Sequence, residues 1–356
     1  MTRLVSSLLI ALIIFSIGLF AQAPNIVLII AEDIGRDWIG CYGGTGSTPN
    51  INRLARQGIR FETVWNMIDA DASMATAFSG RYNPTSTNSN PTLASQLNRN
   101  GYLTVSVNAA QNDFDDPSVP FQEALNRIAD TGRTKPYFLF HRISHGGPVP
   151  NASQYAEYVT GVDQIIGKTI AAVEKSTQSE NTFLIFTSAS CSPFPGRLAD
   201  TPQPRSKGLN SDLGAHAPLI VQAPFFNSKL RVSKDLIDFS DLYPTLLEVA
   251  TSRLQTRPHL DGKSFIPSLK GSDDPFDKRS WIYAQQGDFR MIRDWHHLVD
   301  NRGSFHDLEK DPLQQEAVSP LDKQAPHRQE RLQMILDRLA GKPTRSLEDR
   351  IRGHAQ

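Results

Sequence analysis

The stretch that decides the fold lies near the start of the chain, where residues 25–43 read NIVLIIAEDIGRDWIGCYG. Ile26–Ile30 is an unbroken apolar, β-branched run, the pattern of a strand buried on both faces of a parallel sheet. It is followed by two adjacent acids, Glu32 and Asp33. Open α/β sheets bind ligands at the carboxyl ends of their strands, where carboxylate oxygens suit Ca2+ or Mg2+. From this stretch alone, a metal site and a pair of ordinary capping residues are equally good interpretations.

Beyond this stretch, strand-like apolar runs alternate with helical patterns. Strands are predicted at 59–65, 101–107, 136–141, 182–187 and 218–222, and helices at 51–58, 69–80, 93–98 and 155–174. The alternation predicts an α/β fold, with a large doubly wound, mostly parallel sheet flanked by helices. After residue 275 the pattern changes to short strands at 281–284, 290–293 and 297–300 and a helix at 328–339. These predict a small C-terminal antiparallel sheet with one helix.

The same patterns divide the chain into four segments. They are a signal peptide at 1–23, an α/β domain at 24–274, a small α+β subdomain at 275–340 and a polar tail at 341–356. Arg3, the apolar run Leu8–Phe20 and the small residues of Ala21–Ala23 match the three parts of a secretory signal peptide. We therefore expect a secreted or periplasmic protein with no stable membrane insertion after cleavage.

The charge balance and the cysteine count give little further information about partners. Lys plus Arg and Asp plus Glu each number 37, so the formal net charge is zero. A neutral chain has no global field that attracts nucleic acid, and no nucleic-acid partner is expected. The two cysteines, Cys41 and Cys191, make no disulfide framework, and the sequence leaves open whether they pair.

Motifs along almost the whole mature chain resemble the sulfatase family of the alkaline-phosphatase-like superfamily. In order, they are residues 24–35, 40–43, 48–55 with Gly58 and Phe61, 76–82, 238–247, 261–264 and 307–312. The resemblance implies the fold predicted above, sulfuric ester hydrolase activity and a pocket for sulfated or anionic carbohydrate. It also implies a metal-binding acidic pair at Glu32 and Asp33, an active-site histidine at His145 and a sulfate-contacting lysine at Lys207.

Several positions to which the resemblance assigns chemistry carry other residues. The family's nucleophile, a cysteine or serine oxidised to formylglycine, falls on Ala70, and the arginine of the same motif falls on Met74. Alanine cannot be converted to formylglycine, so none is expected. Two further metal-ligand positions fall on Ala189 and Ser190, which leaves the acidic pair as a partial site and leaves open whether it binds Ca2+ or Mg2+.

Three hypotheses about function follow. The first is an exported, catalytically impaired or inactive sulfatase homologue whose pocket binds sulfated or anionic glycans. The second is an active sulfate or phosphate ester hydrolase with a rearranged nucleophile at Asp71, Ser73 or Thr76. The third is a non-catalytic protein-interaction module. Because nucleophile, anion clamp and half of the metal shell are replaced together, and such groups act as one unit, the sequence favours the first hypothesis.

Overall fold

The computed structural model describes residues 23–82, 92–110, 123–124, 126, 135–253, 260–318 and 325–341. The predicted signal peptide up to residue 22 and the tail beyond residue 341 lie outside the described residues. Within these ranges, none of the helices combines the length and the apolar character that crossing a bilayer requires.

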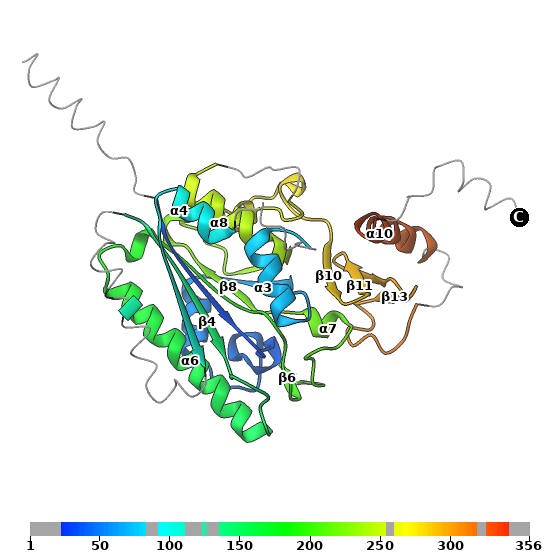
Figure 1. Ribbon diagram of the computed structural model, residues 1–356. Coiled ribbons are helices and arrows are strands. Elements are labelled where there is room, and N and C mark those ends of the chain that lie inside the picture. The colour runs from blue at the N-terminus through cyan, green and yellow to red at the C-terminus, as the bar shows by residue number, and fades with distance from the viewer. Residues whose placement is uncertain are drawn as a thin grey trace, which may run out of the picture.

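A seven-stranded sheet forms the centre of the structure (Figure 1). Across the sheet the strands are β3 (Leu103–Ala110), β4 (Tyr137–Ser144), β1 (Asn25–Ala31), β5 (Thr182–Ser188), β8 (Leu219–Gln222), β2 (Ile59–Trp65) and β9 (Val232–Asp238). Neighbouring strands are parallel except where β8 pairs with β5 and β2. The predicted doubly wound, mostly parallel sheet is confirmed. Strand β9 has no predicted counterpart, because its first half is polar and partly exposed.

Helices cover both faces of this sheet. They are α2 (Pro49–Gln57), α3 (Ala70–Ser79), α4 (Leu93–Arg99), α6 (Ala152–Lys175), α7 (Asp212–Ala215), α8 (Leu242–Thr251) and α9 (Ile266–Leu269). Figure 1 shows α3, α4 and α8 on one side and α6 on the other. The helices predicted around residues 51–58, 69–80, 93–98 and 155–174 are therefore present, with ends that differ by a few residues.

Alternate residues of β1 supply two separate cores, because successive side chains of a strand point to opposite faces. Ile26, Leu28 and Ile30 share one apolar cluster with side chains of α3, α4 and α8. Val27 and Ile29 belong to a second cluster with side chains of α2 and α6. Every residue of β1 is buried, as the apolar run predicts.

The C-terminal part forms a second sheet of four antiparallel strands. They are β10 (Ile282–Gln286), β11 (Phe289–Arg293), β12 (His297–Asp300) and β13 (Phe305–Asp307). Helix α10 (Ala325–Leu339) packs on this sheet through the buried side chains of Leu332 and Leu336. The predicted antiparallel sheet with one helix is confirmed. Its other face shares a core with Trp65 and Leu236 of the large sheet.

A buried polar cluster joins the two sheets near the end of β9. Arg279, just before β10, lies 2.6 Å from the Asp241 carboxylate and 3.6 Å from that of Asp238. The same guanidinium donates to the backbone carbonyl of Asp261 at 2.7 Å. The Tyr82 hydroxyl donates to Asp238 at 2.7 Å. Three of the motifs that resemble sulfatases, at 76–82, 238–247 and 261–264, meet in this cluster, so their contribution here is to the scaffold.

Both cysteines are free thiols. Burial raises the pKa of Cys41 to about 12 and also raises the pKa of the fully buried Cys191. A thiol with a raised pKa carries little thiolate at neutral pH. The structure therefore gives neither cysteine a disulfide partner or the properties of a reactive nucleophile.

Candidate functional site

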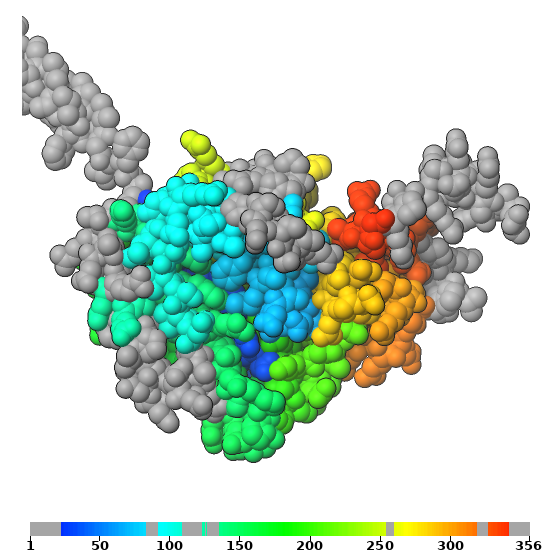
Figure 2. Space-filling view, viewed as in Figure 1, coloured from blue at the N-terminus to red at the C-terminus, as the bar shows by residue number. Residues whose placement is uncertain are grey.

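The acidic pair lies where β1 ends, at the carboxyl edge of the parallel strands. Strands β4 and β5 flank β1, and their residues Ile143 and Ser188 lie beside Ala31 in register. Three strand ends therefore meet at one edge, the place at which α/β sheets hold their ligands. In the space-filling view, a small dark-blue patch from the early part of the chain surfaces in a hollow between light-blue and green segments (Figure 2).

Hydroxyl groups hold the backbone of the acidic turn. Asp33 has a φ of 61°, in the left-handed region that few residues other than glycine adopt. The Ser190 hydroxyl accepts the Asp33 N–H at 2.8 Å and donates to the Asp33 carboxylate at 2.7 Å. The hydroxyls of Tyr155 and Tyr158 donate to the carbonyl oxygens of Asp33 and Glu32 at 2.6 and 2.7 Å. Burial raises the pKa of both tyrosines well above its ordinary value, so both remain protonated donors.

Each acid of the pair has a basic partner. Arg142 of β4 lies 2.5 Å from the Glu32 carboxylate, and Lys207 lies 2.6 Å from the Asp33 carboxylate. The acid side chains are 17% and 10% exposed, whereas those of Arg142 and Lys207 are 37% and 44% exposed. Arg142 also approaches the exposed carboxylate of Asp71 at 3.6 Å. The edge thus combines three carboxylates with two cations.

The predicted nucleophile position is the first residue of α3. Asp69 caps this helix, because its carboxylate accepts the Ala72 N–H at 2.9 Å. Ala70 and Met74 are partly buried and pack against the core between the sheet and α3, α4 and α8. The contact between Asp71 and Arg142 places this end of α3 beside the acidic edge.

The hydroxyls considered as replacement nucleophiles are buried. Ser73 has no exposed surface, and its hydroxyl donates to the Asp69 carbonyl at 2.6 Å and accepts the Met67 N–H at 2.9 Å. Thr76 is 1% exposed. Neither residue is therefore accessible to an ester in solution in this structure. Asp71 is the candidate of the three that solvent reaches, with a side chain 91% exposed.

His145 lies close to the acidic turn but contacts it through another residue. Its Nδ1 is 3.0 Å from the carbonyl oxygen of Gly147, and its ring packs edge-on against Tyr158 at 5.4 Å between ring centres. Tyr158 in turn donates to the Glu32 carbonyl. The structure therefore brings Lys207 into direct contact with Asp33, next to Glu32, and His145 into their surroundings. A catalytic role for His145 stays a prediction.

Sequence reasoning missed Arg142 and the hydroxyl partners of the turn. The predicted strand ended at His141, whereas β4 continues to Ser144. The register pairs Ile30 with Arg142, so the guanidinium starts one strand away from the acids. A charged residue between the buried His141 and Ile143, close to the strand end, was the available signal.

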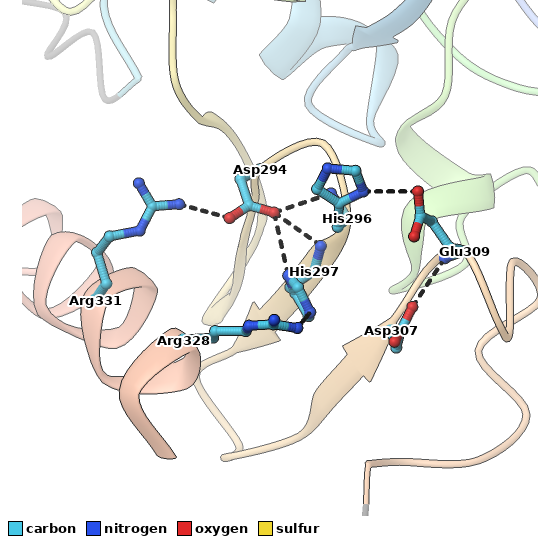
Figure 3. A pocket seen from close by; sticks show the side chains of 7 residues that line it. All are labelled: Asp294, His296, His297, Asp307, Glu309, Arg328 and Arg331. Carbon is cyan, nitrogen blue, oxygen red and sulfur yellow. Dashed lines mark hydrogen bonds and ion pairs between the residues drawn. The ribbon is translucent and has the colours of Figure 1, made fainter. Parts of the chain in front are cut away.

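A cavity of about 400 Å3 lies elsewhere, in the C-terminal part of the chain (Figure 3). Its lining residues are Asp294, His296, His297, Asp307, Glu309, Arg328 and Arg331. Figure 3 shows Arg331 pointing from α10 toward Asp294, at 2.5 Å, and His296 toward Glu309, at 2.9 Å. None of the predicted site residues lines this cavity, so it is distinct from the acidic edge, although Asp307 and Glu309 of the motif at 307–312 are among its lining residues.

The chain matches one protein-family model and several curated proteins. The sulfatase family model matches residues 24–138 and 108–252. An ulvan-active sulfatase from Formosa agariphila is 26% identical over 307 residues, covering 74% of this chain and 61% of that protein. Arylsulfatase J from Mus musculus is 22% identical over 326 residues, covering 67% and 54%. The chain thus spans little more than half the length of these relatives.

Solved structures share the fold. BT4656, in complex with its substrate D-glucosamine-2-N,6-O-disulfate, superposes with a TM-score of 0.73 at 15% identity, covering 90% of this chain and 98% of that one. Ps i-CgsB, in complex with k-i-k-neocarrahexaose, gives a TM-score of 0.71 at 19% identity, covering 92% and 96%. At these sequence identities the similarity shows a common fold alone.

Proposed function

Since the chain belongs to the sulfatase family, we propose that it is a member that does not hydrolyse sulfate esters. The observation that carries the proposal is the residue at the nucleophile position. Ala70 presents a methyl group there, and Met74 presents a thioether where the family has an arginine. A methyl group has no lone pair with which to attack sulfur, and a thioether cannot hold an anion as a guanidinium does.

The charges at the edge support the same proposal. Transfer of a sulfuryl group requires cationic groups that stabilise the charge developing on the oxygens. Here Arg142 and Lys207 are each within 2.6 Å of a carboxylate, and Asp71 adds a third negative charge. With the two built-in cations committed to acids, the edge offers an incoming sulfate no unpaired positive charge among the side chains described above.

The replaced groups would normally act as a unit. Removing one member of a catalytic set costs orders of magnitude in rate, and removing several leaves only the residual effect of binding. The buried hydroxyls of Ser73 and Thr76 offer no substitute nucleophile. Export from the cytoplasm, predicted from residues 1–23, remains part of the proposal.

A turnover assay tests the proposal. The purified chain is expected to release no 4-nitrophenol from 4-nitrophenyl sulfate or 4-nitrophenyl phosphate above the background of buffer, with or without added Ca2+. Intact mass spectrometry is expected to show residue 70 unmodified. Turnover that disappears in both Asp33→Asn and Asp71→Asn would instead establish a rearranged active site, with the exposed Asp71 as its nucleophile.

A second candidate function is binding of a sulfated carbohydrate without turnover. The side chains of Arg142 and Lys207 are more than one third exposed, so a sulfate that displaced an acid could reach them. The two structural neighbours described above were solved with saccharides bound. We expect such binding to be weak and salt-dependent, because it competes with existing ion pairs. Titration with a disulfated glucosamine at low and high NaCl, using Lys207→Gln as the control, measures it.

A further inference from the structure

The acidic pair is neutralised by the chain itself. In the fold family a divalent cation lies at this position, and a hard cation such as Ca2+ needs six to eight oxygen ligands at short range. Whether these residues fit such an ion depends on which of their oxygen atoms remain free. The contacts of the turn involve every carboxylate and carbonyl oxygen of the two acids except Oε2 of Glu32.

Both carboxylate oxygens of Asp33 are already bonded. Oδ1 accepts from the Ser190 hydroxyl at 2.7 Å, and Oδ2 accepts from the Lys207 ammonium at 2.6 Å. Oε1 of Glu32 accepts from the Arg142 guanidinium at 2.5 Å. Ligation of a cation through these atoms would require breaking both ion pairs.

The backbone oxygens of the turn already accept hydrogen bonds. The carbonyls of Glu32 and Asp33 accept the hydroxyls of Tyr158 and Tyr155. The Ala31 carbonyl accepts the N–H of Ala189 at 2.8 Å. Across the part of the chain that the structure describes, no group of three or more His, Cys, Asp and Glu side chains is arranged to hold a metal ion. The donor set does not fit a divalent cation.

We infer that Arg142 and Lys207 are built-in counter-ions that take the place of the divalent cation at Glu32 and Asp33, so that this acidic pair is neutralised without metal. The two cations come from separate places: Arg142 from β4 and Lys207 from the segment after β7 (Thr201–Gln203). Each approaches one acid, which gives the pair the same two positive charges that one Ca2+ would supply. The inference holds whether or not the protein cleaves esters, because it concerns the ground state of the folded chain.

The test compares melting temperatures of the full chain in EDTA, in 10 mM CaCl2 and in 10 mM MgCl2. The wild type is expected to melt at the same temperature in all three and to give no calcium-binding heat in calorimetric titration. The double variant Arg142→Gln/Lys207→Gln is expected to melt lower in EDTA, because two partly buried carboxylates lose their partners. Calcium should then raise its melting temperature by about 2 °C or more, saturably, as binding to the native state alone requires.

A matched control removes the same charge elsewhere. The exposed side chains of Arg53 and Lys310 pair with Glu174 and Asp307, so Arg53→Gln/Lys310→Gln loses two positive charges without touching the edge. A saturable calcium response of the wild type would overturn the inference. So would a calcium response of the Arg142/Lys207 variant no larger than that of the control. If the double variant does not fold, Lys207→Gln alone, which frees Asp33, gives the same comparison. Ester turnover by a calcium-insensitive wild type would overturn the proposed function and leave this inference standing.

Discussion

Replacing Arg279 by methionine is expected to lower the free energy of unfolding by about 3–5 kcal/mol, the usual cost of removing one partner from a buried ion pair. The guanidinium is 7% exposed, and the carboxylates of Asp238 and Asp241 that it contacts are at most 1% exposed. Its removal leaves two buried negative charges without a cation. The neutral side chain of methionine is of similar length, so the change acts through charge more than through volume.

The pKa shifts in the cluster also indicate that Arg279 stabilises the two buried carboxylates. Burial works to lower the pKa of Arg279, yet Asp238 and Asp241 together raise it well above its ordinary value. Burial raises the pKa of Asp241 to about 6, against the opposing pull of Arg279. Two carboxylates share one guanidinium, so the repulsion between Asp238 and Asp241 adds to the effect of burial on the pKa of Asp241. In the variant, a carboxylate can take up a proton as the pH falls, so the loss of stability should be smaller at pH 5 than at pH 8.

Urea unfolding at the two pH values measures the effect. Arg53→Met is the control, because Arg53 and Glu174 form a pair whose side chains are 39% and 40% exposed. Exposed pairs contribute about 0–1 kcal/mol, so this variant should unfold almost as the wild type does. Equal losses in the two variants would show that the buried cluster does not stabilise the junction of the two sheets.

Replacing Asp37 by asparagine is expected to stabilise the protein above pH 6. Asp37 is 5% exposed, and burial raises the pKa of its carboxyl group to about 6, against the opposing hydrogen bond from Ser192. Its Oδ1 accepts from the Ser192 hydroxyl at 2.7 Å, whereas Oδ2 is buried without a hydrogen-bond partner. An asparagine amide can keep the contact with Ser192, and it carries no charge that burial would destabilise. The gain at pH 8 is expected to reach up to about 3 kcal/mol.

The direction of the pH dependence follows from proton binding. Between the pKa of about 4 that an unfolded aspartate has and the folded value of about 6, the native state binds more protons than the unfolded state. The contribution of Asp37 to stability is therefore fully present below pH 4 and is lost as the pH rises through 6. The variant has no such loss. Its free energy of unfolding should therefore exceed that of the wild type increasingly as the pH rises from 4, and the two should be equal at pH 4.

Chemical denaturation between pH 4 and pH 8 tests this expectation. Asp288→Asn, at an exposed position in the turn between β10 and β11, is the control for a change of one surface charge. The free energy of unfolding of this control should differ from that of the wild type by a small amount that is nearly constant with pH. A variant at Asp37 that is less stable than the wild type at pH 8, or whose difference does not change with pH, would contradict the assignment of a buried carboxylate.

The fold could be predicted because its signals are local. Strand β1 is apolar along its whole length and buried along its whole length, so the pattern and the structure coincide. Strand β9 escaped prediction because exposed polar residues in its first half dilute the apolar signal of Leu236 and Ile237. The C-terminal helix was found from its amphipathic spacing, with Leu332 and Leu336 buried as that spacing requires.

The site was predictable in its position but not in its contacts. The carboxyl end of β1 follows from the strand pattern, and Lys207 followed from the resemblance. The pairing of Glu32 with Arg142 depends on the register between β1 and β4, across 110 residues of sequence, which no local pattern specifies. Ser190 was interpreted as a lost ligand position, yet its hydroxyl bonds Asp33 twice. Residue types indicate which groups are missing from the edge, whereas the side chains that replace them are determined by the tertiary structure.

The two ion pairs at the end of β1 also change what sets the occupancy of the site. A bound ion exchanges with the medium, so its occupancy follows the concentration outside the protein. Arg142 and Lys207 are attached to the chain 2.5 and 2.6 Å from their acids, so their effective concentration is fixed by the fold and cannot be diluted or chelated away. A free cation must compete with partners that belong to the same chain. Glu32 and Asp33 are therefore equally neutralised in calcium-poor and calcium-rich surroundings.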